Sequence, residues 1–171
     1  MVGCWFGRYE VVNWLKRMAV DLDGLLFLSV RFMIPPKTKN ELCWRCKPVF
    51  CKLFKSLLGR HWNKVYGRYF TLVGVQEFGR YGNRHAHFIL GVGGGLKVVE
   101  VQTTLRGLSC KLKMDVWTSE EDKQTSPKQF GADIMAKLVY SARVDEYITK
   151  ELWISGTRMN DNFILDTDMF Y

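Results

Sequence analysis

Residues 66–92 read YGRYFTLVGVQEFGRYGNRHAHFILGV and predict a β-hairpin. A strand rich in Val, Tyr and Phe (66–78) leads through a turn containing Gly and Asn into an apolar strand (84–92). Because successive side chains of a strand point to opposite faces of the sheet, His85 and His87 share one face. Two imidazoles on one face can bind a divalent ion through their ring nitrogens, so the hairpin is a candidate metal site.

The rest of the chain predicts helices and strands that pack around this hairpin. Strands are expected at 25–33 and 114–118, helices at 38–62, 96–112 and 133–153, and a polar surface loop at 119–130. This order indicates an α+β fold, with a central antiparallel sheet and packed helices. The length of 171 residues suits one domain covering 1–171, with a C-terminal tail at 156–171 that docks through Phe163-Ile164-Leu165.

A third ligand is expected beside the two histidines, since hard divalent ions prefer oxygen donors. Glu77 is the best candidate because it ends the first strand of the hairpin and can lie across from the histidines. Gln76 would point to the opposite face and is the weaker alternative. The remaining histidine, His61, is expected to end the long helix, where a positive imidazole suits the helix dipole.

A candidate nucleophile follows in the helix expected over 133–153. Tyr147 and Lys150 are three residues apart and therefore share a helix face. Tyrosine is a weak nucleophile because the pKa of its hydroxyl is about 10. A neighbouring cation favours the phenolate and can also bind a phosphate. Tyr140 lies on nearly the same face, but Arg143 takes the place of the lysine, so we expect Tyr140 to pack or to position the substrate.

These two motifs resemble those of a known family. His85-Ala86-His87 is similar to the His-hydrophobic-His motif of HUH endonucleases, and Tyr147-Ile148-Thr149-Lys150 to their Tyr-x-x-Lys motif. Leu26-Phe27-Leu28-Ser29-Val30-Arg31-Phe32 resembles the first-strand motif of the rolling-circle replication initiators in that family, and the three motifs follow in the family's order. The resemblance implies an RRM-like HUH domain that binds Mg or Mn through His85, His87 and an acid placed like Glu77.

The resemblance also implies a reaction. HUH replication initiators nick single-stranded DNA in a sequence-specific way, and the tyrosine that attacks, here Tyr147, stays joined to the 5′ phosphate. Lys150 would bind phosphate, and the nick would start rolling-circle replication of a plasmid or virus. Expected partners are single-stranded or hairpin origin DNA and a host replication helicase, because this chain has no Walker motif of its own. The alternatives are an HUH transposase or mobilisation relaxase and, in another class, a non-catalytic nucleic-acid-binding domain.

The charge distribution agrees with a nucleic-acid partner. Formal net charge is +8, and the segment from Lys37 to Arg68 carries nine basic residues against one acid, Glu41. Such clustering is typical of nucleic-acid binders, although a solvated helix face is the alternative. The residues expected to contact DNA are Lys47, Lys52, Lys55, Arg80, Arg84, Lys137 and Arg143.

The cysteines indicate packing rather than a zinc site. Cys43, Cys46 and Cys51 form Cys-x2-Cys-x4-Cys, but zinc needs four ligands and a second Cys-x2-Cys pair is missing. Helical periodicity in this segment favours small core residues. The odd total of five cysteines also argues against a secreted disulfide framework.

Targeting signals are not expected. The apolar stretch 25–34 contains Arg31, is stopped by Pro35-Pro36 and is far shorter than the ~20 residues that span a bilayer. It also lies too far into the chain for a signal peptide. We therefore expect no membrane partner and an intracellular protein, cytoplasmic in a prokaryote or nuclear for a eukaryotic virus.

Overall fold

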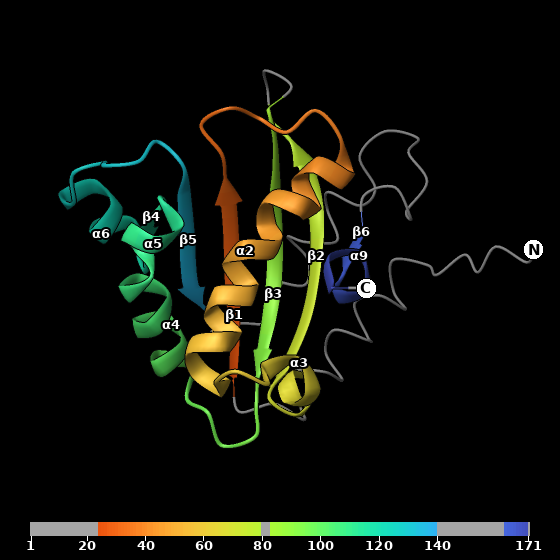
Figure 1. The fold of residues 1–171 in the computed structure, drawn as a ribbon. Helices are drawn as coiled ribbons and strands as arrows, with labels where there is room; N and C mark the ends of the chain where they lie inside the picture. Colours follow the sequence, from red (N-terminus) through yellow and green to blue (C-terminus); the bar gives the residue numbers. More distant parts are fainter. Residues whose placement is uncertain (1–23, 80–82, 140–162, 171) are drawn as a thin grey trace, which may run out of the picture.

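The computed structural model describes residues 24–79, 83–139 and 163–170, which form a six-stranded sheet with packed helices (Figure 1). The spatial order of the strands is β4-β5-β1-β3-β2-β6. Neighbours are antiparallel except β4 and β5, which are parallel. The strands are β1 (Gly24–Arg31), β2 (Phe70–Phe78), β3 (Arg84–Val92), β4 (Asp115–Trp117), β5 (Asp133–Leu138) and β6 (Phe163–Leu165). The predicted α+β fold is confirmed, with a mixed sheet in place of a purely antiparallel one.

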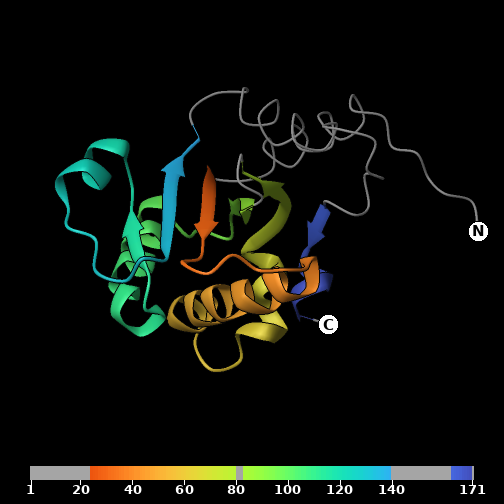
Figure 2. The same cartoon turned by 90° about the horizontal axis from the view of Figure 1, so that it is seen from above.

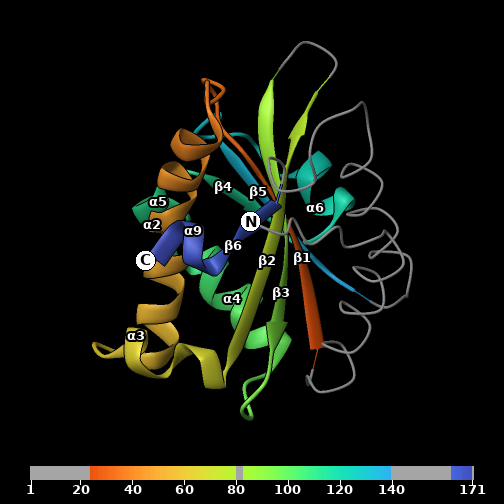
Figure 3. The ribbon, with the colours of Figure 1, turned by 90° about the vertical axis from the view of Figure 1, so that its right-hand side faces the viewer.

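Most helices cover one face of the sheet. Figure 2 shows α2 and α3 together beneath it, and Figure 3 shows α2 on one side of the sheet and α6 on the other. The helical segments are α2 (Lys39–Leu58), α3 (Trp62–Val65), η1 (Tyr66–Arg68), α4 (Val98–Gly107), α5 (Ser109–Leu112), α6 (Glu120–Thr125) and α9 (Asp166–Phe170). Within the described ranges, no helix is both long and apolar enough to cross a membrane.

The long helix α2 has sharp ends. Thr38 caps its start, because the Thr38 hydroxyl accepts from the Glu41 N–H at 3.1 Å, while the Glu41 carboxylate accepts from the Lys37 N–H at 2.7 Å. Gly59 ends it in a positive-φ conformation (φ 81°) that favours glycine. The expectation that His61 ends this helix is wrong, since His61 lies beyond Gly59 as the exposed N-cap of α3.

The hairpin of β2 and β3 sets which side chains face the helices. Ala86 and Phe88 belong to the core shared with α2, and the Phe88 ring meets Phe50 of α2 edge-on with ring centroids 4.9 Å apart. Opposite Phe88 stands Gly74, where a Cβ would lie 2.3 Å from the Phe88 ring, so the packing requires glycine. The alternate side chains of β3, including His87, therefore face away from α2.

Two segments differ from the prediction. The helix expected to begin at Asp133 is instead strand β5, which pairs with β1 and β4 and buries Ile134 and Ala136 on the helix-covered face. The loop expected at 119–130 contains α6, which starts because the Ser119 hydroxyl accepts from the Asp122 N–H at 3.0 Å. Strand β5 thus lies one strand away from the hairpin, beyond β1, and side chains of β5 and α6 share a pocket with those of the hairpin.

The C-terminal segment docks as predicted. Phe163–Leu165 form β6, which pairs antiparallel with β2 and places Ile164 in the main core. The short helix α9 follows, and its Phe170 packs on Phe54 of α2 with ring centroids 5.9 Å apart. These residues complete the edge of the sheet beside β2.

Candidate metal centre

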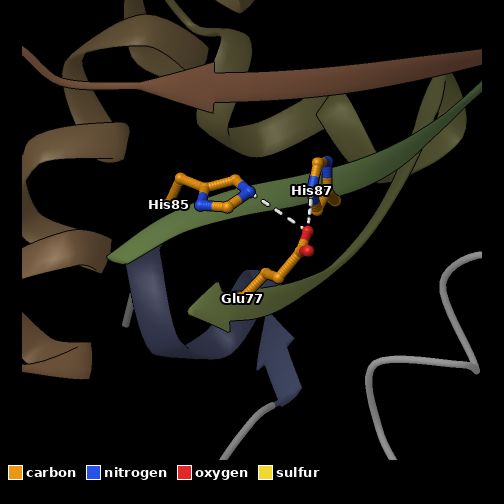
Figure 4. Close-up of side chains that lie close together, drawn as sticks. All are labelled: Glu77, His85 and His87. Atoms are coloured by element: carbon orange, nitrogen blue, oxygen red, sulfur yellow. Dashed lines mark hydrogen bonds and ion pairs between the residues drawn. The ribbon is translucent and has the colours of Figure 1, made fainter. Parts of the chain in front are cut away.

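Three potential metal ligands converge on the face of the sheet opposite α2 (Figure 4). The register of the hairpin places Glu77 directly across from His85. Glu77 Oε2 lies 3.1 Å from His85 Nε2 and is also hydrogen-bonded to Nε2 of His87. One ligand atom from each residue lies within 4.8 Å of the other two, and among the described residues no other group of His, Cys, Asp and Glu meets this condition. The predicted triad is thus brought together.

The arrangement of His85 fits a cation between the side chains. Its Nδ1 lies 3.2 Å from the backbone oxygen of Asn83, and its Nε2 faces Glu77 Oε2. A neutral imidazole carries only one N–H, so if Nδ1 donates to Asn83, the lone pair of Nε2 faces a carboxylate oxygen. Two acceptors facing each other need a proton or a metal ion between them. Metal-binding histidines commonly donate their other ring nitrogen to a backbone carbonyl, as His85 does here.

His87 is positioned by its neighbours in the sheet. The Phe27 ring on β1 stacks on its imidazole, with ring centroids 5.2 Å apart and the planes inclined by 16°. The side chain of His87 is buried, whereas those of His85 and Glu77 are partly exposed. The triad therefore has a closed side at His87 and an accessible side at His85.

The electrostatics favour an ionised carboxylate. Hydrogen bonds from His85 and then His87 lower the pKa of Glu77 to about 2. For His85, burial lowers the pKa, but the hydrogen bonds to Glu77 and Asn83 outweigh it and raise the pKa above its ordinary value. For His87, burial dominates and the pKa is lowered despite the hydrogen bond to Glu77. Glu77 is an anion at neutral pH, as a carboxylate that binds a metal ion must be.

The lowered pKa of Glu77 predicts a pH dependence of the metal-free protein. The stabilisation by an ionised Glu77 is fully present above its ordinary pKa of 4.5 and is lost as the pH falls from there toward about 2. We expect the urea midpoint of a Glu77→Gln variant to fall less steeply between about pH 6 and about pH 3 than that of the unaltered protein. Glu121→Gln, at an exposed position on α6, is the control. Parallel midpoint curves for Glu77→Gln and the unaltered protein would contradict the expectation.

A pocket of about 520 Å³ extends from the triad across the sheet. Its floor is β1 and β5, and its far wall is α6. Besides the triad, the pocket is lined by Phe27, Ser29, Arg31, Glu120, Lys123, Met135 and Lys137. Lys137 was among the predicted DNA-binding residues, whereas Arg31 on β1 and Glu120 and Lys123 on α6 were not. The two residues of α6 were missed because the sequence did not indicate that this segment lies on the same side of the sheet as the triad.

Arg84 and Gln76 lie on the other face. The Arg84 guanidinium donates to the Gln76 side chain and, at 3.1 Å, to the backbone oxygen of Lys37, and it lies 4.4 Å from the centroid of the Phe78 ring. These contacts tie the hairpin to the segment before α2. The expectation that Gln76 points away from the histidines is confirmed, and the side chain of Arg84, a predicted DNA contact, is engaged within the protein.

Lys47, Lys52 and Lys55 were predicted to contact DNA phosphates, and they lie exposed on α2. Lys52 Nζ donates to the backbone oxygen of Lys111 at 2.6 Å. Since α2 covers the face opposite the triad, a short strand seated at the triad would have to pass around the sheet to reach them.

This placement leads to a prediction for single-stranded DNA binding. If all three lysines contacted the backbone, replacing them together by alanine would flatten the slope of log affinity against log salt by about two. Because they lie behind the sheet, we expect the slope for a short oligonucleotide to stay unchanged. Fluorescence anisotropy over a salt series measures it. A slope flattened by about two would restore α2 as the DNA-binding surface.

The cysteines of α2 are packed as expected. Cys43 and Cys46 are buried in the main core, and Cys51 is partly buried. Burial raises the pKa of the Cys46 thiol well above its ordinary value, which disfavours the thiolate that binds zinc. Among the described residues, no cysteine joins a group of potential metal ligands.

Several predicted functional residues lie outside the described ranges. They are Tyr140, Arg143, Tyr147, Lys150 and Arg80. The roles assigned to them therefore stay predictions from the sequence.

The chain was compared with protein-family models, with curated proteins and with solved structures, and none of the three comparisons finds a match.

Proposed function

We propose that the chain is a metal-dependent endonuclease and strand transferase of the HUH type, acting on single-stranded or hairpin DNA. The observation that supports it best is the convergence of Glu77 Oε2 and the Nε2 atoms of His85 and His87 on one sheet face. The set of one carboxylate oxygen and two imidazole nitrogens suits a divalent transition ion, and the choice of Mg or Mn rests on the resemblance of the sequence motifs.

The proposed roles divide between the hairpin and the segment that carries Tyr147. His85, His87 and Glu77 would hold the ion, which, when bound, polarises a phosphate oxygen and stabilises developing charge. The Tyr147 hydroxyl would lose its proton and attack phosphorus. The new tyrosine–phosphate bond forms as the bond to the 3′ oxygen breaks, and that oxygen leaves as a hydroxyl after taking up a proton. Lys150 would bind the phosphate beside Tyr147.

Initiation of rolling-circle replication is the biological role we propose for this reaction. The order of the three sequence motifs supports it, and the RRM-like form of the domain belongs to the same proposal. Origin DNA would be the substrate, and a host replication helicase would extend the opened duplex. A transposase or mobilisation relaxase would use the same chemistry, so the DNA site that is nicked, and not the chemistry, separates them.

The test is the formation of a covalent adduct. The protein is incubated with a pool of single-stranded oligonucleotides and Mn, and the products are separated on a denaturing gel. The proposal expects a protein band shifted by attached DNA, which disappears in EDTA. DNA binding in native conditions without any adduct, with Mn or with Mg, would favour the non-catalytic nucleic-acid-binding domain.

A further inference from the structure

The pocket beside the triad carries positive charge on its far side. Its lining comes from side chains on five neighbouring elements, running from Glu77 on β2 across β3 and β1 to Lys137 on β5 and Lys123 on α6. Arg31 on β1 stands between the two ends. A nucleic-acid backbone with one phosphate at the triad could therefore place further phosphates near three cations that line the same pocket: Arg31, Lys123 and Lys137. This path runs opposite to α2.

The three cations differ in how firmly they are held. Arg31 Nε pairs with Asp133 Oδ1 at 2.9 Å, and the Asp133 side chain is only 10% exposed, so this pair is built into the sheet. Lys123 lies 5.5 Å from the centroid of the Trp117 ring. Lys137 Nζ pairs with Glu120 Oε1 at 2.5 Å, and here the side chains are 39% and 61% exposed. An exposed ion pair contributes little net stability and exchanges readily for another partner.

Glu120 stands where an anion is attracted by all three cations. Its pKa is lowered, first by the hydrogen bond from Lys137 and also by the charges of Lys137, Lys123 and Arg31. Its carboxylate is therefore charged at neutral pH. A phosphodiester oxygen has the charge and acceptor geometry to replace it on Lys137.

We infer that Lys137 binds a backbone phosphate of the nucleic-acid strand seated at the triad, and that in the free protein Glu120 occupies the place of that phosphate. The identity of the ligand as nucleic acid rests on the proposed function. The evidence for an anion-binding site is the pocket and the Lys137–Glu120 ion pair. Lys137 is a positioning residue, because it would hold the strand next to the reacting phosphate without taking part in bond breaking.

The inference predicts effects of opposite sign from the two partners. Lys137→Met should weaken binding of a short single-stranded oligonucleotide about tenfold and flatten its salt slope by about 0.7, the value for one phosphate contact. Glu120→Gln should strengthen binding about threefold, because a competing anion is removed. In a Lys137→Met background the gain from Glu120→Gln should largely disappear, because the two residues act on one contact.

Fluorescence anisotropy in EDTA, repeated with Mn, measures these affinities without depending on cleavage. Matched controls are Lys128→Met and Glu121→Gln, which remove the same charges at exposed positions that do not line the pocket. Thermal midpoints check that each variant is folded. A thymidine monophosphate titration separates a strand site from a site for single nucleotides, since a strand site expects much weaker binding of the monophosphate.

Equal effects of Glu120→Gln and Glu121→Gln would mean that only the net charge matters, and this would overturn the inference. Unchanged binding in Lys137→Met would also overturn it, as would the absence of oligonucleotide binding in both buffers. Tighter binding of the monophosphate than of the strand would also overturn it. Opposite-sign effects without any covalent adduct would keep the binding site and reject the nuclease. An adduct with unchanged affinities in these variants would support the nuclease and reject the binding site at Lys137.

Discussion

A Tyr147→Phe variant is expected to form no covalent adduct with single-stranded DNA, while keeping its fold and much of its DNA affinity. The substitution removes only the hydroxyl that would attack phosphorus, and phenylalanine retains the ring for packing. The measurement is the Mn-dependent adduct on a denaturing gel, beside native binding of the same oligonucleotide. An affinity close to that of the unaltered protein would show that the lost adduct reflects lost chemistry.

Tyr140→Phe is the matched control, since it removes the same group from the tyrosine seven residues earlier. We expect it to form the adduct. If Tyr140→Phe abolished the adduct and Tyr147→Phe did not, the nucleophile would be Tyr140. Loss in both variants would mean that the Tyr140 hydroxyl is also needed for the adduct.

Replacing His85 and His87 together by alanine is expected to abolish Mn binding measured by calorimetry. Each loss of a ligand or of its supporting partner commonly costs about 10–100-fold in affinity, and the double variant leaves only Glu77. Glu77→Ala alone should weaken binding within that range. His61→Ala, at an exposed histidine outside the triad, should bind Mn normally.

Two outcomes would contradict this assignment. Unchanged Mn affinity in Glu77→Ala would mean that the third ligand lies elsewhere. Zinc retained by the double histidine variant would point to the cysteines of α2, although their burial argues against it. Either result would change the assignment of the ion ligands without bearing on the strand-binding inference at Lys137.

The triad was predictable because its three residues lie on two consecutive strands of one hairpin. A turn of known length joins two strands with clear alternation, so the pairing register follows from the hairpin itself. That register placed Glu77 across from His85 and sent Gln76 to the other face, as the structure shows. The contact of Oε2 with both imidazoles then joins side chains on neighbouring strands.

Strand β5 was not predictable in the same way. Residues 133–138 read DIMAKL, in which Met, Ala, Lys and Leu are good helix formers, and the sequence continues toward the Tyr-x-x-Lys motif. The strand forms because β1, about a hundred residues earlier in the chain, offers a complete partner from Leu26 to Arg31. Pairing with a strand so far away in the chain cannot be recognised from the hydrophobic pattern of a six-residue segment.

The start of helix α6 is marked in the sequence. Ser119 and Asp122 form the capping pattern of a helix start, with a hydroxyl three residues before an acid, inside a segment interpreted as a polar loop. Recognising it would still not have placed Glu120 beside Lys137. That contact also depends on β5, so both wrong predictions, for residues 133–138 and for residues 119–130, had to be corrected before Glu120 and Lys137 could be placed together.

The division of the pocket between a hairpin and distant segments has a consequence for how such a protein can diversify. The three candidate donor atoms come from one pair of consecutive strands joined by a short turn, so the candidate ion site is encoded in a contiguous stretch and costs little loop-closure entropy. The rest of the pocket includes side chains of β5 and α6, which follow about thirty to fifty residues later in the chain. Substitutions and insertions there can therefore change the lining of the pocket while the three donor atoms stay in place. The donor set and the remaining lining can thus vary independently of each other in a single small sheet.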